Sequence, residues 1–190
     1  MIMSQLPSFQ APRSVLATSV AVGTAIAGAL AVLGVMAQAA DRSTLKVPNG
    51  LAFSEFTGYE DWVDVAVSET EHGIKVIVAN PVMIKAYRDG VPGQGKQFPD
   101  GSKIAKIEWT LKRNSESPYA VTIPGDLKSL SFIEKDLTRF PDTHGWAYAQ
   151  FLYDAMSDTL TPNGNDAKCG YACHSRVATQ DYIYTAYPNR

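Results

Sequence analysis

Two cysteines and a histidine near the carboxyl end form the most informative motif of the sequence. Cys169 and Cys173 are separated by three residues, and His174 directly follows the second cysteine. Two thiols followed by an imidazole are typical of covalent haem attachment, in which the thiols add to the vinyl groups and the imidazole binds the iron. The usual gap is two residues, so one residue must bulge, which Gly170 permits because glycine adopts strained backbone angles. The motif predicts one haem c, with His174 as the metal ligand.

Two other interpretations of the cysteines stay open. Cys169 and Cys173 could form a local disulfide, because export to an oxidising compartment favours oxidation, or they could be inert core thiols. A disulfide does not require His174 as the next residue, and the chain has no further cysteine. The alternative is therefore a haem-free exported β-sheet binding protein with a Cys169–Cys173 disulfide.

Composition excludes several classes of protein. The 190 residues include 17 basic and 19 acidic side chains, a formal charge of −2, which argues against binding to nucleic acid. Two cysteines are too few for a disulfide scaffold or a four-cysteine zinc site. Three histidines leave little room for a multi-histidine metal centre. The length is that of a single folded domain.

The first forty residues have a different composition from the rest. Residues 15–36 are uncharged and rich in Ala, Val and Gly, and they lead into Ala37-Gln38-Ala39. This small-x-small pattern predicts a cleaved signal peptide over residues 1–39 and a periplasmic haem domain over residues 40–190. The run is also long enough to span a bilayer, so an anchor in the inner membrane, with the domain facing the periplasm, is the alternative. Membrane contact is expected only in that case.

The elements that must position the motif are mostly strands. Alternating and β-branched runs predict strands, and Asn80-Pro81 predicts the start of a helix that Gly90 ends. A short helix is expected to carry the cysteines, followed by an aromatic segment over residues 181–187. The fold class is α+β, a mainly antiparallel β-sheet with a few short helices and the haem attached near the C-terminus. The predicted strands cover residues 63–67, 74–79, 103–112, 130–134 and 146–153.

Four blocks outside the cysteine motif carry a family resemblance. They are Phe98–Gly101 with Lys106, Lys135–Pro141, Gly145–Tyr148 and Asp181–Thr185. In order and spacing the chain resembles the cytochrome P-460 family of periplasmic, monohaem, largely β-sheet c-type cytochromes, which includes cytochromes c′-beta. The resemblance implies that Cys169 and Cys173 attach the haem and that His174 is its proximal ligand.

The resemblance also singles out Lys106. In hydroxylamine-oxidising members a lysine at the matching position is bonded to the porphyrin edge. The alternative is a solvent-facing strand lysine, because Lys106 shares its strand face with Glu108 and Thr110, opposite the apolar row that begins at Ala105.

Three residues are candidates for the distal side of the haem. The resemblance places Ser131 and Phe132 where oxidising members have a carboxylate or a small residue. Phe132 is similar to the aromatic cap of cytochromes c′-beta, although ordinary core packing explains it equally well. Glu134 lies two residues further and, by alternation, on the face of Phe132, so it is a candidate base.

The expected function is nitrogen-oxide chemistry at an open haem site. Met83 and Met156 lie in helical or loop contexts, and no sixth ligand is evident. This favours nitric oxide binding or hydroxylamine oxidation, and it leaves open whether the protein is an enzyme. The expected partners are a small nitrogenous ligand or substrate and a periplasmic redox partner, with a homodimer also open. A six-coordinate electron-transfer cytochrome is the alternative.

Overall fold

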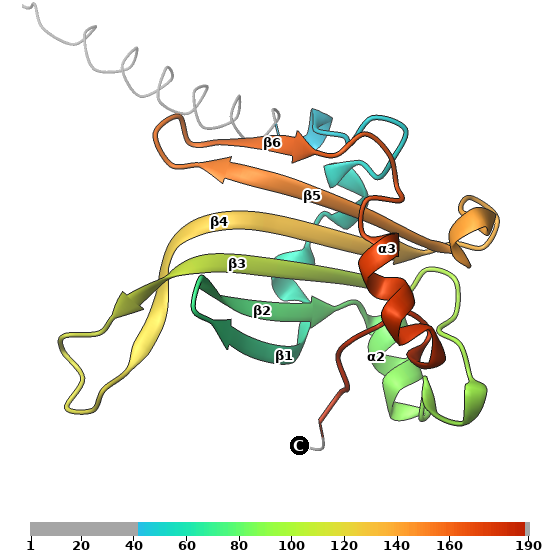
Figure 1. The fold of residues 1–190 in the computed structure, drawn as a ribbon, viewed down its shortest axis with the longest axis horizontal. Coiled ribbons are helices and arrows are strands. Elements are labelled where there is room, and N and C mark those ends of the chain that lie inside the picture. Colours follow the sequence, from blue (N-terminus) through green and yellow to red (C-terminus); the bar gives the residue numbers. More distant parts are fainter. Residues whose placement is uncertain (1–41, 189–190) are drawn as a thin grey trace, which may run out of the picture. The chain divides into compact units, whose positions relative to one another are not determined.

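Each strand of the sheet pairs with its neighbour in sequence. The computed structural model describes residues 42–188, so the predicted signal peptide or anchor over residues 1–39 lies outside the described residues. Six antiparallel strands follow one another in the order β1-β2-β3-β4-β5-β6 (Figure 1). They are β1 (Val63–Thr70), β2 (Gly73–Ala79), β3 (Lys103–Arg113), β4 (Thr122–Lys135), β5 (Trp146–Asp154) and β6 (Thr159–Asn163). This arrangement confirms the predicted fold class.

The helices are short and lie between the strands or near the ends of the domain. Helices α2 (Pro81–Arg88) and α3 (Tyr171–His174) accompany the sheet. The 3₁₀ helices in the described part of the chain are η1 (Phe53–Phe56), η2 (Tyr59–Asp61), η3 (Gly93–Gly95), η4 (Pro141–Thr143) and η5 (Ser175–Gln180). Figure 1 shows α3 in front of one face of the sheet, near the start of β5. Within residues 42–188, no helix is both long and apolar enough to cross a membrane.

Helix α2 forms as its sequence predicts. The side chain of Asn80 caps the helix by accepting a hydrogen bond from the Met83 amide at 3.1 Å, and Pro81 occupies the first turn. The helix ends at Arg88, and Gly90 follows with a φ of 86°, a value that glycine adopts without strain. Met83 is fully buried in the core that α2 forms on the sheet.

One face of the sheet is an aromatic core. The ring of Phe132 is fully buried and stacks on Phe56, with 4.3 Å between ring centroids. Phe53 and Tyr59 meet the same ring edge-on at 5.2 Å and 5.4 Å. These partners belong to η1 and η2, so the amino-terminal 3₁₀ helices are held to the sheet mainly by aromatic packing.

The other face of the sheet is available to a site. Side chains alternate between the faces, so the neighbours of Phe132 in β4 point away from the aromatic core. Across the sheet, the register places five residues in one row on this second face. The row runs Ile77, Lys106, Ser131, Gln150 and Asn163.

Two parts of the sheet were not predicted. Strand β4 begins at Thr122, eight residues before the predicted start, and its first part contains Pro124 and Gly125, which weaken the strand pattern. Strand β6 is a five-residue edge strand that contains Pro162. Both segments form strands through pairing with a neighbour, since β4 pairs with β3 and β6 pairs with β5.

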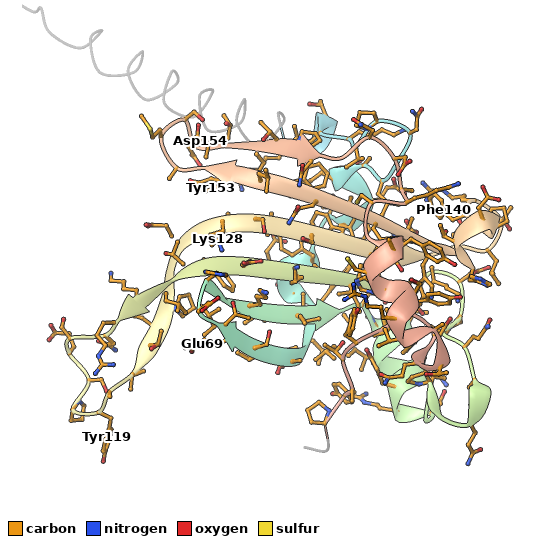
Figure 2. The ribbon with its side chains drawn as sticks, viewed as in Figure 1. Glu69, Tyr119, Lys128, Phe140, Tyr153 and Asp154 are labelled. Atoms are coloured by element: carbon orange, nitrogen blue, oxygen red, sulfur yellow. The ribbon has the colours of Figure 1, made fainter. Side chains whose placement is uncertain are left out.

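Truncating Phe132 tests the aromatic core. We expect Phe132→Ala to lower the free energy of unfolding by about 3–5 kcal/mol, because the change leaves a cavity among four packed rings. Urea denaturation followed by tryptophan fluorescence measures the loss. The matched control is Tyr119→Ala, since Tyr119 lies in the turn between β3 and β4, points into solvent (Figure 2) and is 78% exposed. Equal stability of Phe132→Ala and the wild type would contradict this assignment.

Candidate cofactor site

A cavity of about 620 Å³ lies on the sheet face opposite the aromatic core. Its floor is the register row that runs from Ile77 to Asn163. Cys169, Cys173 and His174 form one wall, and Ile183–Thr185 of the carboxyl-terminal segment contribute another. Cavities that bind drug-sized ligands and cofactors typically measure about 300–1,000 Å³. The sheet, α3 and the carboxyl-terminal segment therefore build one pocket of suitable size.

Both cysteines face this cavity as free thiols. The structure contains no Cys169–Cys173 disulfide, and both residues are exposed. Burial of the thiol group and the negative charge of Asp166 raise the pKa of Cys169. Because neither thiol is bonded to another group, both can contact a partner that binds in the pocket.

Glycine at position 170 is required by close packing. A Cβ atom at Gly170 would lie 2.5 Å from the ring of Tyr148, which is too close for any real contact. The backbone angles of Gly170 are ordinary helical values, with φ of −94° and ψ of −14°. Gly170 therefore shows no strained backbone angles in this structure, and its lack of a side chain lets the cysteine segment pack against Tyr148 of β5.

His174 is oriented by a backbone carbonyl. Its Nδ1 lies 2.6 Å from the carbonyl oxygen of Tyr182, which can only accept a hydrogen bond. Nδ1 therefore carries the proton, and Nε2 keeps a lone pair that can bind a metal. The imidazole also packs between Tyr148 and Tyr184, with ring centroids 4.8 Å and 5.1 Å away.

Burial favours the neutral, metal-binding form of this imidazole. Desolvation lowers the pKa of His174, opposed by its hydrogen bond to Tyr182 and reinforced by the positive charge of Lys106. Metal binding requires a deprotonated imidazole nitrogen. The buried position of His174 therefore favours the neutral imidazole, which is the form that can bind a metal ion.

Lys106 stands on the floor of the cavity. Its neighbours in the register row are Ile77 and Ser131, and its half-buried side chain lies on the face opposite Ala105, as alternation predicted. Burial lowers the pKa of Lys106, with an opposing effect from Glu108. Among residues 42–188, no hydrogen bond or ion pair engages its amine.

The donor set fits a haem better than a free metal ion. Two thiols and one imidazole with a free Nε2 face the same pocket, as thioether attachment and axial ligation require. In the part of the chain that the structure describes, no group of three or more His, Cys, Asp or Glu side chains could hold a metal ion. The residues that line this cavity therefore fit a haem that two cysteines and one histidine would hold.

Comparison with protein families identifies the chain. Residues 56–185 match the family described as Cytochrome P460, a range that includes all six strands, Lys106 and the cysteine motif. The chain belongs to the cytochrome P460 family. A comparison with curated proteins finds no match. Membership confirms the resemblance seen in the sequence and establishes a haem-binding cytochrome.

The distal candidates of this cytochrome separate between the two faces of the sheet. Ser131 lies on the cavity floor next to Lys106. Phe132 borders the cavity, but its ring packs in the aromatic core, which is the alternative that the sequence left open. It does not form an aromatic cap, because adjacent strand residues point to opposite faces.

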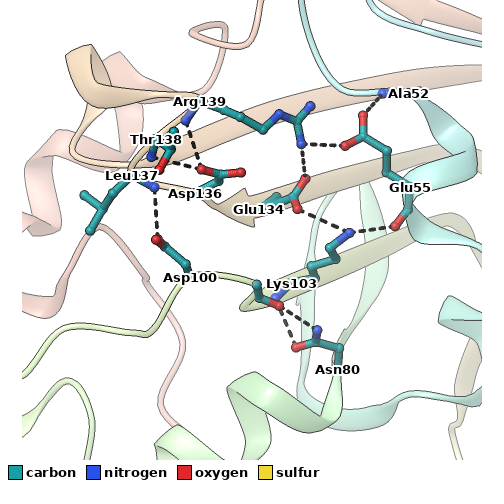
Figure 3. Close-up of polar contacts among 11 residues, drawn as sticks. Ala52, Glu55, Asn80, Asp100, Lys103, Glu134, Asp136, Leu137, Thr138 and Arg139 are labelled. Atoms are coloured by element: carbon teal, nitrogen blue, oxygen red, sulfur yellow. Dashed lines mark hydrogen bonds and ion pairs between the residues drawn. The ribbon is translucent and has the colours of Figure 1, made fainter.

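Glu134 is also directed away from the cavity. Its carboxylate lies 3.3 Å from Lys103 and 3.2 Å from Arg139, and Arg139 also pairs with Glu55 at 2.7 Å (Figure 3). Burial raises the pKa of Glu134, although the charges of Lys103 and Arg139 oppose the shift. This network joins η1 to β4, so a role for Glu134 as the distal base is not supported by its position.

Two polar residues of the cavity floor were not predicted. Asn163 donates a hydrogen bond of 2.7 Å to the side-chain oxygen of Gln150, and both residues line the cavity. Alternation with Tyr148 along the predicted strand could have identified Gln150. Asn163 could not be found, because its strand was missed.

The close approach of Gly170 to Tyr148 predicts that a side chain at this position lowers the stability of the cytochrome. We expect Gly170→Ala to lower the free energy of unfolding by about 1–3 kcal/mol, because the added methyl group must displace the Tyr148 ring. Haem content per folded protein should fall as well. Gly93→Ala is the control, since a Cβ there meets nothing within 4 Å. If both variants match the wild type in stability and absorbance, the packing assigned to Gly170 is wrong.

Proposed function

We propose that this cytochrome carries one covalent haem c in the cavity and uses its open side to bind small nitrogen oxides. The observation that carries the proposal is the convergence of Cys169, Cys173 and the free Nε2 of His174 on a single pocket. The two thiols would form thioether bonds with the vinyl groups of the haem, and Nε2 of His174 would bind its iron. The bound haem supplies an iron that holds small ligands and exchanges electrons.

We propose that the protein works in the periplasm. The uncharged residues 15–36, followed by Ala37-Gln38-Ala39, support export with cleavage after residue 39, and an uncleaved anchor facing the periplasm is the alternative. A redox partner in the same compartment would exchange electrons with the haem.

The cavity walls support an open sixth position. Met83 is fully buried in the core beneath α2, and Met156 is 98% exposed in the turn before β6. Neither methionine lines the cavity, and among its described lining residues His174 is the only histidine. A six-coordinate electron-transfer cytochrome would need another side chain in the sixth position.

The lining favours a neutral ligand. No carboxylate is among the described residues that line the cavity, so no acidic side chain is placed to remove a proton from a substrate. Nitric oxide needs neither a base nor a charged partner to bind. Nitric oxide binding is therefore the activity that these walls support best.

Lys106 favours hydroxylamine oxidation as a second candidate. Burial lowers its pKa, which increases the share of neutral amine, the nucleophilic form. In hydroxylamine-oxidising members of the family a lysine at this position is bonded to the porphyrin. A bond from Lys106 to the haem would place this protein with those enzymes.

Covalent attachment is tested on protein matured in a host with a cytochrome c assembly system. We expect the denatured chain to retain one haem per polypeptide, with a pyridine haemochrome spectrum typical of two thioether bonds. The variant Cys169→Ala/Cys173→Ala should release its haem on acid extraction. A wild-type chain that loses its haem in the same extraction would refute covalent attachment.

The open site is tested by absorption spectroscopy of the reduced protein. Carbon monoxide and nitric oxide should each shift the Soret band, because no side chain has to be displaced from the iron. Met83→Leu and Met156→Leu should give the wild-type spectra, since both residues lie outside the cavity. A Soret band that neither gas shifts would favour the six-coordinate alternative.

The Lys106 bond is tested by peptide mapping of the mature protein. If hydroxylamine oxidation is the activity, the peptide containing Lys106 should carry the mass of haem and Lys106→Arg should abolish both the link and the oxidation. Lys75→Arg is a suitable control, because Lys75 lies on the neighbouring strand outside the cavity. A haem-free Lys106 peptide would leave nitric oxide binding as the function.

A further inference from the structure

A buried carboxylate lies just before the residue that orients His174. The side chain of Asp181 is 2% exposed, and both of its oxygens lie near Nζ of Lys135, at 2.9 Å and 3.2 Å. Asp181 also accepts hydrogen bonds from the Trp146 indole at 3.2 Å and from the Phe98 amide at 2.7 Å. Lys135 is itself fully buried, so both charges have left water.

Stability alone explains this ion pair poorly. Removing two charges from water costs several kcal/mol for each ion, and apolar replacements of buried pairs are often neutral or stabilising. In several proteins such pairs instead hold a segment in one conformation. The Asp181 carboxylate joins three distant parts of the chain, namely β4, β5 and the loop before β3.

The backbone at this point has an uncommon conformation. Asp181 and Tyr182 have consecutive positive φ angles of 48° and 64°, which cost free energy for residues other than glycine. This double left-handed turn ends η5 and places the Tyr182 carbonyl 2.6 Å from Nδ1 of His174. The surrounding contacts of Asp181 must hold this turn.

We infer that Asp181, fixed by Lys135, is a positioning residue that sets the donor strength of His174 through the Tyr182 carbonyl. The inference rests on the haem ligation proposed above. A hydrogen bond from Nδ1–H to a fixed acceptor makes an imidazole a stronger ligand. Stronger donation favours ferric iron, so the intact turn holds the reduction potential down.

The experiment compares haem-loaded variants of the full chain. Asp181→Asn removes the charge that holds Lys135, and Lys135→Met/Asp181→Asn removes both charges, so no unpaired ion stays buried. Glu134→Gln is the matched control, because it weakens another buried charged network, on the opposite face of the sheet and without contact to His174. The readouts are the reduction potential and the iron–histidine stretching band of the ferrous protein in resonance Raman spectra.

In both Asp181 variants we expect a higher reduction potential and a lower stretching frequency than in the wild type. Glu134→Gln should lower stability without moving either quantity. A double variant that holds haem with the wild-type potential and frequency would overturn the inference. Failure of the haem proposal looks different, since the wild-type protein would then lack covalent haem or an iron–histidine band.

Discussion

The hydrogen bond between His174 and the Tyr182 carbonyl is the interaction on which the cofactor site depends. At 2.6 Å it fixes which ring nitrogen carries the proton and directs Nε2 to the cavity that the two cysteines share. An imidazole free to rotate or to change tautomer would not present one nitrogen reliably. The acceptor is a main-chain oxygen, so its position is decided by the fold of the carboxyl-terminal segment and not by a side-chain rotamer.

The two faces of the sheet have different roles, because one packs the aromatic core and the other forms the floor of the cavity. Aromatic rings around Phe132 join the amino-terminal 3₁₀ helices to one face, and the cavity with Lys106 and Ser131 occupies the other. A one-residue shift in register would exchange the two sets of side chains. The same antiparallel pairing that builds the core therefore places a lysine, a serine and an amide on the floor of the pocket.

Local sequence patterns predicted the elements whose formation depends mainly on neighbouring residues, namely most of the strands and helix α2. Alternating and β-branched runs located five of the six described strands, and Asn80-Pro81 located α2. The motif ending at His174 predicted the haem that membership of the cytochrome P460 family implies. Tertiary packing decided the rest. It directs the ring of Phe132 into the aromatic core, and it brings Asp181 next to Lys135, 46 positions away in sequence. Alternation did place Glu134 on the face of Phe132, but only the structure shows that this face is closed by η1.

The proposed function requires an iron atom next to His174, inside the cavity that the β-strands and α3 line. Anomalous diffraction at the iron absorption edge, from crystals of the matured protein, tests this claim directly. We predict one iron peak in the cavity, at coordination distance from Nε2 of His174, with Cys169 and Cys173 bonded to the macrocycle. An iron peak elsewhere, or a cavity without iron in protein that contains one haem per chain, would contradict the account.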